Sequence, residues 1–183
     1  MIERATEFAG SILADRLPRR WAHSLGVLRE AERLAPILGD DAELLACAAV
    51  LHDVGYAPEA IDTGQHMIDG ARFLRRNGVD ERVCWIVAHH TSSPWEAAEL
   101  GLRPALDEFP SMDSRLIDAI TYCDLCAGPD GNHVVPADRL AEVLDRYGPD
   151  HVVFRAVSAA RPHLLEMVGR VDDQLRGVVA TQS

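Results

Sequence analysis

At 183 residues, with 48% hydrophobic and 26% charged residues, the chain has the length and composition of one soluble globular domain. Its net charge of −11 argues against a surface for a nucleic acid polymer, and no apolar run is long enough to predict a membrane span. All 18 basic residues are arginines, so guanidinium groups are the only permanent side-chain cations available to hold a phosphate or carboxylate.

The lack of a recognisable signal peptide and the cysteine usage both predict a cytoplasmic protein. Charged residues appear at once after the start, where a signal peptide would have an apolar core. The cysteines fall inside predicted helices, which favours reduced thiols. Cys123 and Cys126 form a C-x-x-C, but no second pair completes a zinc ribbon, so we expect core residues, with a redox or metal role as the alternative.

Glycine and proline divide the first half of the chain into helix-length segments without any alternating strand pattern. Helices are predicted over residues 3–17 and 19–38. A third contains the run Leu44 to Leu51, apolar on every face, which is typical of a helix buried inside a bundle. Gly55 is placed to close that helix.

A loop over residues 56–64 precedes a fourth helix that ends at 77–78, with Asp62 or Thr63 as its expected cap. His66 shares one face of this helix with Gly70 and Phe73, so it points inward, and Gly70 would let another element approach closely. The fifth helix is expected over residues 80–90.

The second half of the chain begins with a proline-containing segment, 91–110, that predicts a long connection with one helical turn at 95–100. A sixth helix is expected from Ser111 to Ala127, ended by a Gly-Pro-Asp-Gly turn. Residues 136–147 and 149–177 predict two or three more helices, with Pro162 as a break. We find no internal repeat or linker, so a single all-α helical domain over residues 1–183 is expected.

Several histidines and aspartates lie on the apolar faces of these helices. His23 follows the stripe of Val27 and Leu34, and the doublet His52-Asp53 ends the most apolar run of the chain. A buried carboxylate costs several kcal/mol unless something compensates it, and a bound cation does so. The predicted inward set is completed at the ends and faces of three other helices: His66, His89 or His90, and Asp124.

This order of residues resembles the HD superfamily of metal-dependent phosphohydrolases. The resemblance rests on His23, the doublet His52-Asp53 and the distant Asp124, and it spans residues 19–127, with helices over 136–177 following. It implies a helical bundle around a metal. His66 and His89-His90-Thr91 resemble the extra histidines of the subset with two metals.

The resemblance implies a first ion held by His23, His52, Asp53 and Asp124, and a second held by His66, His89 and His90, with Asp53 as the bridge. Two such ions could activate a hydroxide for attack on a phosphoryl group, which gives His52 and Asp53 the catalytic positions. Iron or manganese is the first expectation from imidazole and carboxylate ligands, with zinc, nickel, cobalt or magnesium as alternatives.

The segment from Arg20 to Val27 resembles HD-type hydrolases that split diadenosine tetraphosphate symmetrically. Tyr56 replaces the lysine that HD-GYP phosphodiesterases carry after His-Asp-x-Gly, which argues against a cyclic dinucleotide. We therefore expect a small phosphorylated, nucleotide-like substrate. Arg19 and Arg20, one turn before His23, are the first candidates to bind it, followed by Arg72 with its neighbours Arg75 and Arg76.

The same ligand set also suits a different reaction class, because some HD-fold proteins use a mixed-valent di-iron centre to cleave C–C or C–P bonds with oxygen. A non-catalytic HD domain is a third hypothesis, disfavoured by the complete ligand set. No membrane or nucleic acid polymer is expected as a partner, and a homo-oligomer is left open.

Overall fold

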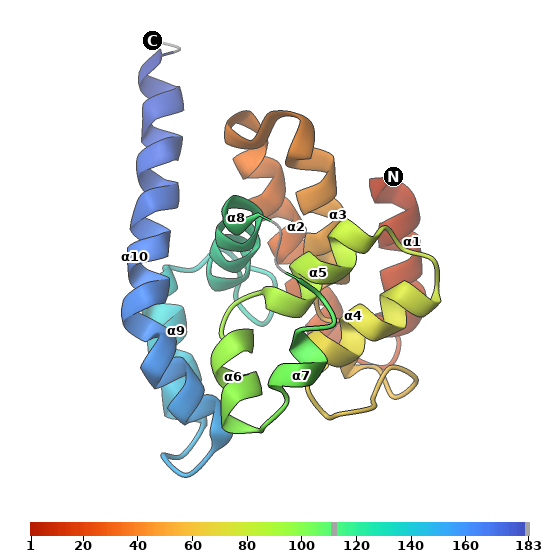
Figure 1. The fold of residues 1–183 in the computed structure, drawn as a ribbon. Coiled ribbons are helices and arrows are strands. Elements are labelled where there is room, and N and C mark those ends of the chain that lie inside the picture. Colours follow the sequence, from red (N-terminus) through yellow and green to blue (C-terminus); the bar gives the residue numbers. More distant parts are fainter. Residues whose placement is uncertain (111–112, 182–183) are drawn as a thin grey trace.

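The computed structural model describes residues 1–110 and 113–181, and in this part of the chain the fold is all-α (Figure 1). Its sole extended pairing there is an isolated bridge between Ala127 and His133. The prediction of an all-helical fold is therefore confirmed. The N-terminal half contains α1 (Ile2–Leu13), α2 (Pro18–Leu38), η1 (Gly39–Asp41), α3 (Ala42–Leu51), η2 (Val54–Tyr56), α4 (His66–Arg76) and α5 (Glu81–His89).

The C-terminal half contains α6 (Ser93–Glu99), α7 (Arg103–Leu106), α8 (Ser114–Leu125), α9 (Pro136–Arg146) and α10 (Val152–Thr181). The segment expected as one long connection thus forms two short helices, which bury Ala97 and Leu106 in the core. The expected start of the sixth helix at Ser111 lies outside the described residues.

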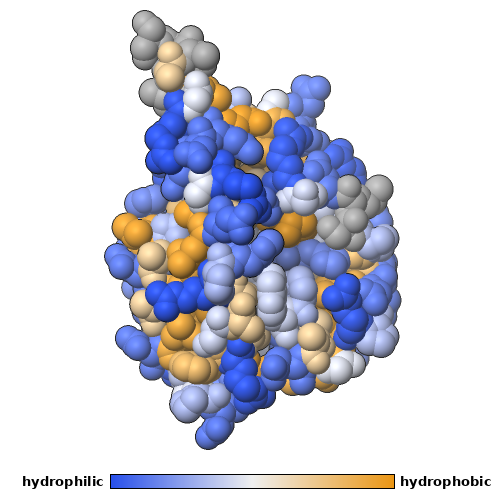
Figure 2. Space-filling model, turned by 60° about the vertical axis from the view of Figure 1, so that its left-hand side comes forward, coloured by the Kyte–Doolittle hydropathy of each residue, from blue (hydrophilic) through white to orange (hydrophobic). Residues whose placement is uncertain are grey.

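The predicted break at Pro162 is wrong, because α10 continues through it. A proline inside a helix removes one backbone donor and leaves the carbonyl four residues earlier without its partner. That residue, Ser158, and Pro162 itself are both exposed, so water can satisfy the carbonyl. The helix then runs on past the body of the molecule, as its projecting end shows (Figures 1 and 2).

Helix α3 is the centre of the bundle. Every residue from Leu44 to Leu51 is buried, as its apolar composition predicts. It packs against α1, α2, α5 and α8, so its C-terminal end lies in the middle of the molecule rather than at the surface. The helix ends where His52 and Asp53 follow.

Gly55 does not close α3, contrary to expectation, since α3 ends at Leu51 and Gly55 lies inside η2. Its role is close packing: a Cβ at Gly55 would lie 1.9 Å from the carbonyl oxygen of His66 and 2.6 Å from the backbone nitrogen of Gly70. The expectation that Gly70 permits a close approach is confirmed. This contact seats the first turn of α4 against η2, which follows α3.

The remaining helices cover the bundle. Helix α10 packs along α2, α6, α8 and α9, and α9 also contacts α8. None of the helices in the described part of the chain combines the length and apolarity needed to cross a membrane.

Candidate metal centre

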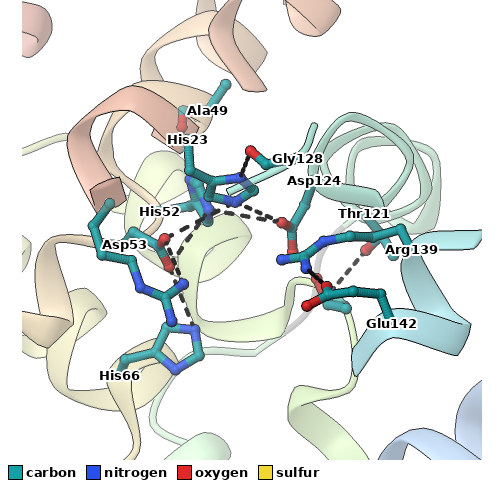
Figure 3. Close-up of polar contacts among 12 residues, drawn as sticks. His23, Ala49, His52, Asp53, His66, Thr121, Asp124, Gly128, Arg139 and Glu142 are labelled. Atoms are coloured by element: carbon teal, nitrogen blue, oxygen red, sulfur yellow. Dashed lines mark hydrogen bonds and ion pairs between the residues drawn. The ribbon is translucent and has the colours of Figure 1, made fainter. Parts of the chain in front are cut away.

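Imidazoles and carboxylates from α2, the end of α3 and α8 meet at one buried point (Figure 3), and His90 at the end of α5 joins them. His23 Nε2 lies 2.9 Å from Asp124 Oδ1, and His52 Nε2 lies 3.4 Å from Asp53 Oδ1 and 4.0 Å from Asp124 Oδ1. His90 packs edge-on against His52, with ring centroids 5.1 Å apart. Thus His23, His52, Asp53, His90 and Asp124, all predicted from the sequence, form one cluster.

Backbone carbonyls fix the orientation of three of these rings. The Nδ1 atoms of His23, His52 and His90 donate to the carbonyls of Gly128, Ala49 and Val87 at 3.1, 2.7 and 2.6 Å. Because a carbonyl only accepts, Nδ1 of each ring carries a proton. Nε2 of His52 and His90 is then left to act as a ligand, whereas Nε2 of His23 donates to Asp124 Oδ1 in the absence of a cation. This outer partner is typical of metal-binding histidines.

His52 Nε2 provides the sharpest test of whether a cation fits. The atom is buried and has no hydrogen-bond partner among the described residues. Such an atom is costly unless something else binds it. His52 belongs to two groups of residues whose donor atoms lie within 4.8 Å of one another. One group is His23, His52 and Asp124, and the other is His52, Asp53 and His90. The residues present fit a divalent transition metal.

The electrostatics of the cluster also favour a cation. Burial raises the pKa of Asp124, but the hydrogen bond from His23 and the nearby imidazoles outweigh burial and hold that pKa well below its usual value. Burial lowers the pKa of His90, so this ring is neutral and able to ligate. Helices α3 and α5 both end here, and a helix C-terminus carries partial negative charge.

His66 lies at the edge of the cluster, at the first position of α4. Its Nε2 is 3.7 Å from Asp53 Oδ1, its ring stacks on Tyr56 at 4.1 Å, and His90 lies 5.3 Å away between centroids. Burial lowers the pKa of His66 well below its usual value. The expected inward orientation of His66 is therefore observed.

The loop before α4 is held in an unexpected way. Neither Asp62 nor Thr63 caps the helix; instead the backbone N–H groups of Asp62, Thr63 and Gly64 donate to the buried carboxylate of Asp69 at 3.1, 2.8 and 2.9 Å. A carboxylate in the first turn of a helix, accepting several backbone donors, is well stabilised. Asp69 thereby fixes the backbone that carries His66.

The histidine pair at the end of α5 is divided between two environments. His90 enters the cluster, whereas His89 Nε2 donates to the carbonyl of Phe109. The expectation left open which of the two is a ligand, and the geometry favours His90. Neighbouring residues on a helix point about 100° apart, which explains the separation.

The candidate substrate arginines also divide. Arg20 Nη1 lies 3.1 Å from Asp53 Oδ2, and its guanidinium stacks 3.9 Å from the Tyr56 ring centroid at the edge of an open pocket of about 690 Å³. Arg19 pairs with Asp130 at the surface and lines an adjoining hollow. Arg72 pairs with Asp62 and Glu108 and lies outside the pocket, so the structure gives it no place near the cluster.

Two features of the site were not expected from sequence. Arg139 and Arg146 of α9 line the pocket, although their spacing alone indicates only a shared helix face.

The second feature is the backbone of Thr91, which adopts a positive φ of 54°, unusual for a β-branched residue. The Thr91 hydroxyl donates to Asp124 Oδ2 at 2.5 Å, and the Thr91 N–H donates to Thr121 Oγ1 at 2.9 Å. Strained backbone of this kind clusters at functional sites.

Curated relatives share only part of their length with this chain. A tRNA (cytidine(56)-2'-O)-methyltransferase of Picrophilus torridus is 30% identical over 160 residues, covering 82% of this chain and 43% of the relative. Ribonuclease Y of Rubrobacter xylanophilus is 38% identical over 79 residues, covering 43% of this chain and 15% of the relative. The chain therefore spans less than half the length of these relatives. No solved structure matches significantly.

A family model described as "HD domain" matches residues 20–150, a range that includes every member of the cluster and also α9. The match covers well over half of the chain. The matched residues include the buried histidines and aspartates that fit a divalent metal. The chain belongs to the HD domain family.

Proposed function

We propose that the protein hydrolyses a phosphate ester or anhydride in a small, nucleotide-like molecule. The observation that carries this proposal is the buried His52 Nε2, which faces two carboxylates without a hydrogen-bond partner among the described residues, beside an arginine-lined pocket. A cation explains the first feature, and a phosphorylated ligand explains the second.

Each residue has a role that follows from its position. His23, His52, His90 and Asp124 would hold a cation, with Nδ1 of each histidine anchored to a backbone carbonyl. Asp53 directs Oδ1 towards His52 and His66 and Oδ2 towards Arg20, so it suits a bridging position. When bound, a divalent cation activates water and neutralises charge on the phosphoryl group.

Arg20 would bind and orient the phosphoryl oxygens. Its bond to Asp53 and its stacking on Tyr56 hold the guanidinium at the mouth of the pocket, where its side chain stays 31% exposed. Burial lowers the pKa of Arg20, but Asp53 and its other anionic neighbours outweigh burial and raise the pKa above its usual value, so the group is a permanent cation.

We further propose two cations per chain, iron or manganese first, the second held by His66 with Asp53. His66 supports this, since its ring is mostly buried and its Nε2 faces the same carboxylate oxygen as His52. The resemblance to symmetrical diadenosine tetraphosphate hydrolases makes dinucleoside polyphosphates the first substrates to try.

The test pairs elemental analysis of protein purified without chelator with a hydrolysis screen of nucleoside mono-, di- and polyphosphates, dinucleoside polyphosphates and a short RNA. We expect transition metal as isolated and turnover of one small phosphate compound. Cleavage of RNA alone would instead favour the chemistry that the name of the ribonuclease relative indicates. Oxygen consumption with an organophosphonate or polyol, without hydrolysis, would favour the di-iron oxygenase. Protein without metal above trace would contradict all three.

A further inference from the structure

A second group of arginines lies next to the metal cluster, around a hollow of about 760 Å³ that the pocket adjoins. Only one carboxylate, Glu142, is found among the described residues that line the hollow. The basic side chains there come from two helices far apart in the sequence, α2 and α9: Arg19, Arg20, Arg139 and Arg146. Arg19 and Arg20 are already paired with Asp130 and Asp53, so the positive charge in excess here is that of the two arginines of α9.

The two arginines of α9 share that single carboxylate. Arg139 and Arg146 each pair with Glu142. Because Glu142 lies three residues after Arg139 and four residues before Arg146, the three side chains lie along one face of the helix. Two guanidinium groups on one carboxylate retain a positive charge between them. The pairing also preorganises both groups, since their side chains are already ordered towards the same point.

The hollow and the metal cluster open onto the same space. Arg20, Arg139 and Arg146 line both the hollow and the pocket that contains Asp53, His66 and Asp124. Figure 3 shows Arg139 and Glu142 beside Asp124, on the side of the cluster away from His66. A molecule held at the cluster would thus reach α9 without leaving the pocket.

We propose that Arg139 and Arg146 form a second anion subsite, which binds a phosphate group of the substrate other than the one attacked. This inference rests on the proposed function. It narrows the substrate class of the proposed hydrolase to compounds with at least two phosphate groups. Guanidinium groups suit the role because each presents a planar fork of donors that matches phosphate oxygens. Glu142 occupies the subsite until a phosphate displaces it.

Binding tests the subsite without any need for turnover. Calorimetric titration of chelator-treated protein with inorganic triphosphate, and in parallel with ATP and inorganic phosphate, should show tighter binding of both triphosphates than of phosphate. Arg146→Ala and Arg139→Ala should each weaken triphosphate binding about tenfold or more, as loss of a charged hydrogen bond does. Glu142→Gln should strengthen it several-fold, because it removes the competing anion and keeps the side-chain shape.

Arg176→Ala is the control, because Arg176 pairs with Asp173 three residues before it on an exposed helix face and lines neither the hollow nor the pocket. It should leave triphosphate binding unchanged. Circular dichroism confirms that each variant keeps its helices. Should Arg139→Ala fail to fold, Arg146→Ala and Glu142→Gln still decide, since both side chains are substantially exposed. Equal affinity in wild type, Arg146→Ala and Glu142→Gln would overturn the subsite.

Kinetics separate failure of the subsite from failure of the proposed function. With a hydrolysed polyphosphate, Arg146→Ala should raise KM and leave kcat within a few-fold, and it should not affect a substrate with one phosphate. Hydrolysis with KM unchanged in Arg146→Ala and Arg139→Ala would reject the subsite and keep the hydrolase. Triphosphate binding that depends on Arg146, in a protein that hydrolyses none of the compounds, would keep the subsite and reject the hydrolase.

Discussion

The two sides of the candidate metal centre are built with different rigidity. On the side of α2, α3 and α8, His23 and His52 are anchored through Nδ1 to backbone carbonyls, and Asp124 accepts from Thr91. On the side of η2 and α4, the ring of His66 has no hydrogen bond to any of the described residues; it stacks on Tyr56 and lies 3.7 Å from Asp53 Oδ1. A ligand with an anchored ring has less conformational freedom to lose on binding a cation.

For the two cations proposed above, this difference predicts unequal affinities. The anchored side should bind its ion first and retain it longer, and the His66 side should exchange more readily. His90 lies between the two, anchored to Val87 and in ring contact with both His52 and His66. The following changes test the comparison, from the largest expected effect to the smallest.

Asp53→Asn removes the one side chain that belongs to both sides. Activity should fall by more than about 10³-fold, since loss of an outer partner of a ligand alone costs about 10–100-fold. Metal content by elemental analysis should fall with it. Asp173→Asn, an exposed carboxylate on α10, is the control and should match wild type. Full metal occupancy in Asp53→Asn would show that Asp53 is not a ligand.

Gly55→Ala should break the His66 side alone. The added methyl would lie 1.9 Å from the carbonyl oxygen of His66, so α4 must shift, at a cost of about 3 kcal/mol in the free energy of unfolding. Gly169→Ala is the matched control, because a Cβ there meets nothing within 4 Å and helix propensity favours alanine by about 1 kcal/mol. Denaturant titration measures both values, and equal stability would contradict the packing argument.

His66→Ala should separate the two positions. We expect about one metal per chain to remain and activity to fall on the order of 100-fold, because His66 serves only the looser side. His89→Ala is the control next to His90: its ring contacts the Phe109 carbonyl, so metal content should not change. Wild-type crystals grown with excess metal that contain a single ion would refute the two-cation proposal.

Thr91→Val should weaken only the anchored side. Valine keeps the shape and the backbone preference of threonine but removes the hydroxyl that donates to Asp124, so affinity for the tighter ion should fall about tenfold. Thr91→Ser retains the hydroxyl and should bind metal as wild type does. Competition with a chromophoric chelator measures the affinities. A loss confined to the weaker ion would reverse the assignment of the two sides.

Much of this architecture could be predicted from local sequence pattern. The apolar run of α3 predicted a buried central helix, and helical spacing predicted that His23, His66 and Asp124 face inward, because side-chain direction repeats every 3.6 residues. Turn signals were less reliable. Gly55 and Pro162 were misinterpreted, since a glycine needed for close packing and a proline on an exposed helix face have the same local signature as a helix end.

The sequence by itself thus determined most of the helices, the chemistry of their inner faces and the identity of most residues in the cluster. Only the tertiary structure decided which atoms meet: His90 rather than His89, the carbonyl of Gly128 that anchors His23, and the arginines of α9 beside Asp124. Periodicity describes one helix at a time. Arg20 of α2 and Arg139 of α9 line one hollow although more than 100 residues separate them, and His23 donates to the carbonyl of Gly128 across a separation of 105 residues.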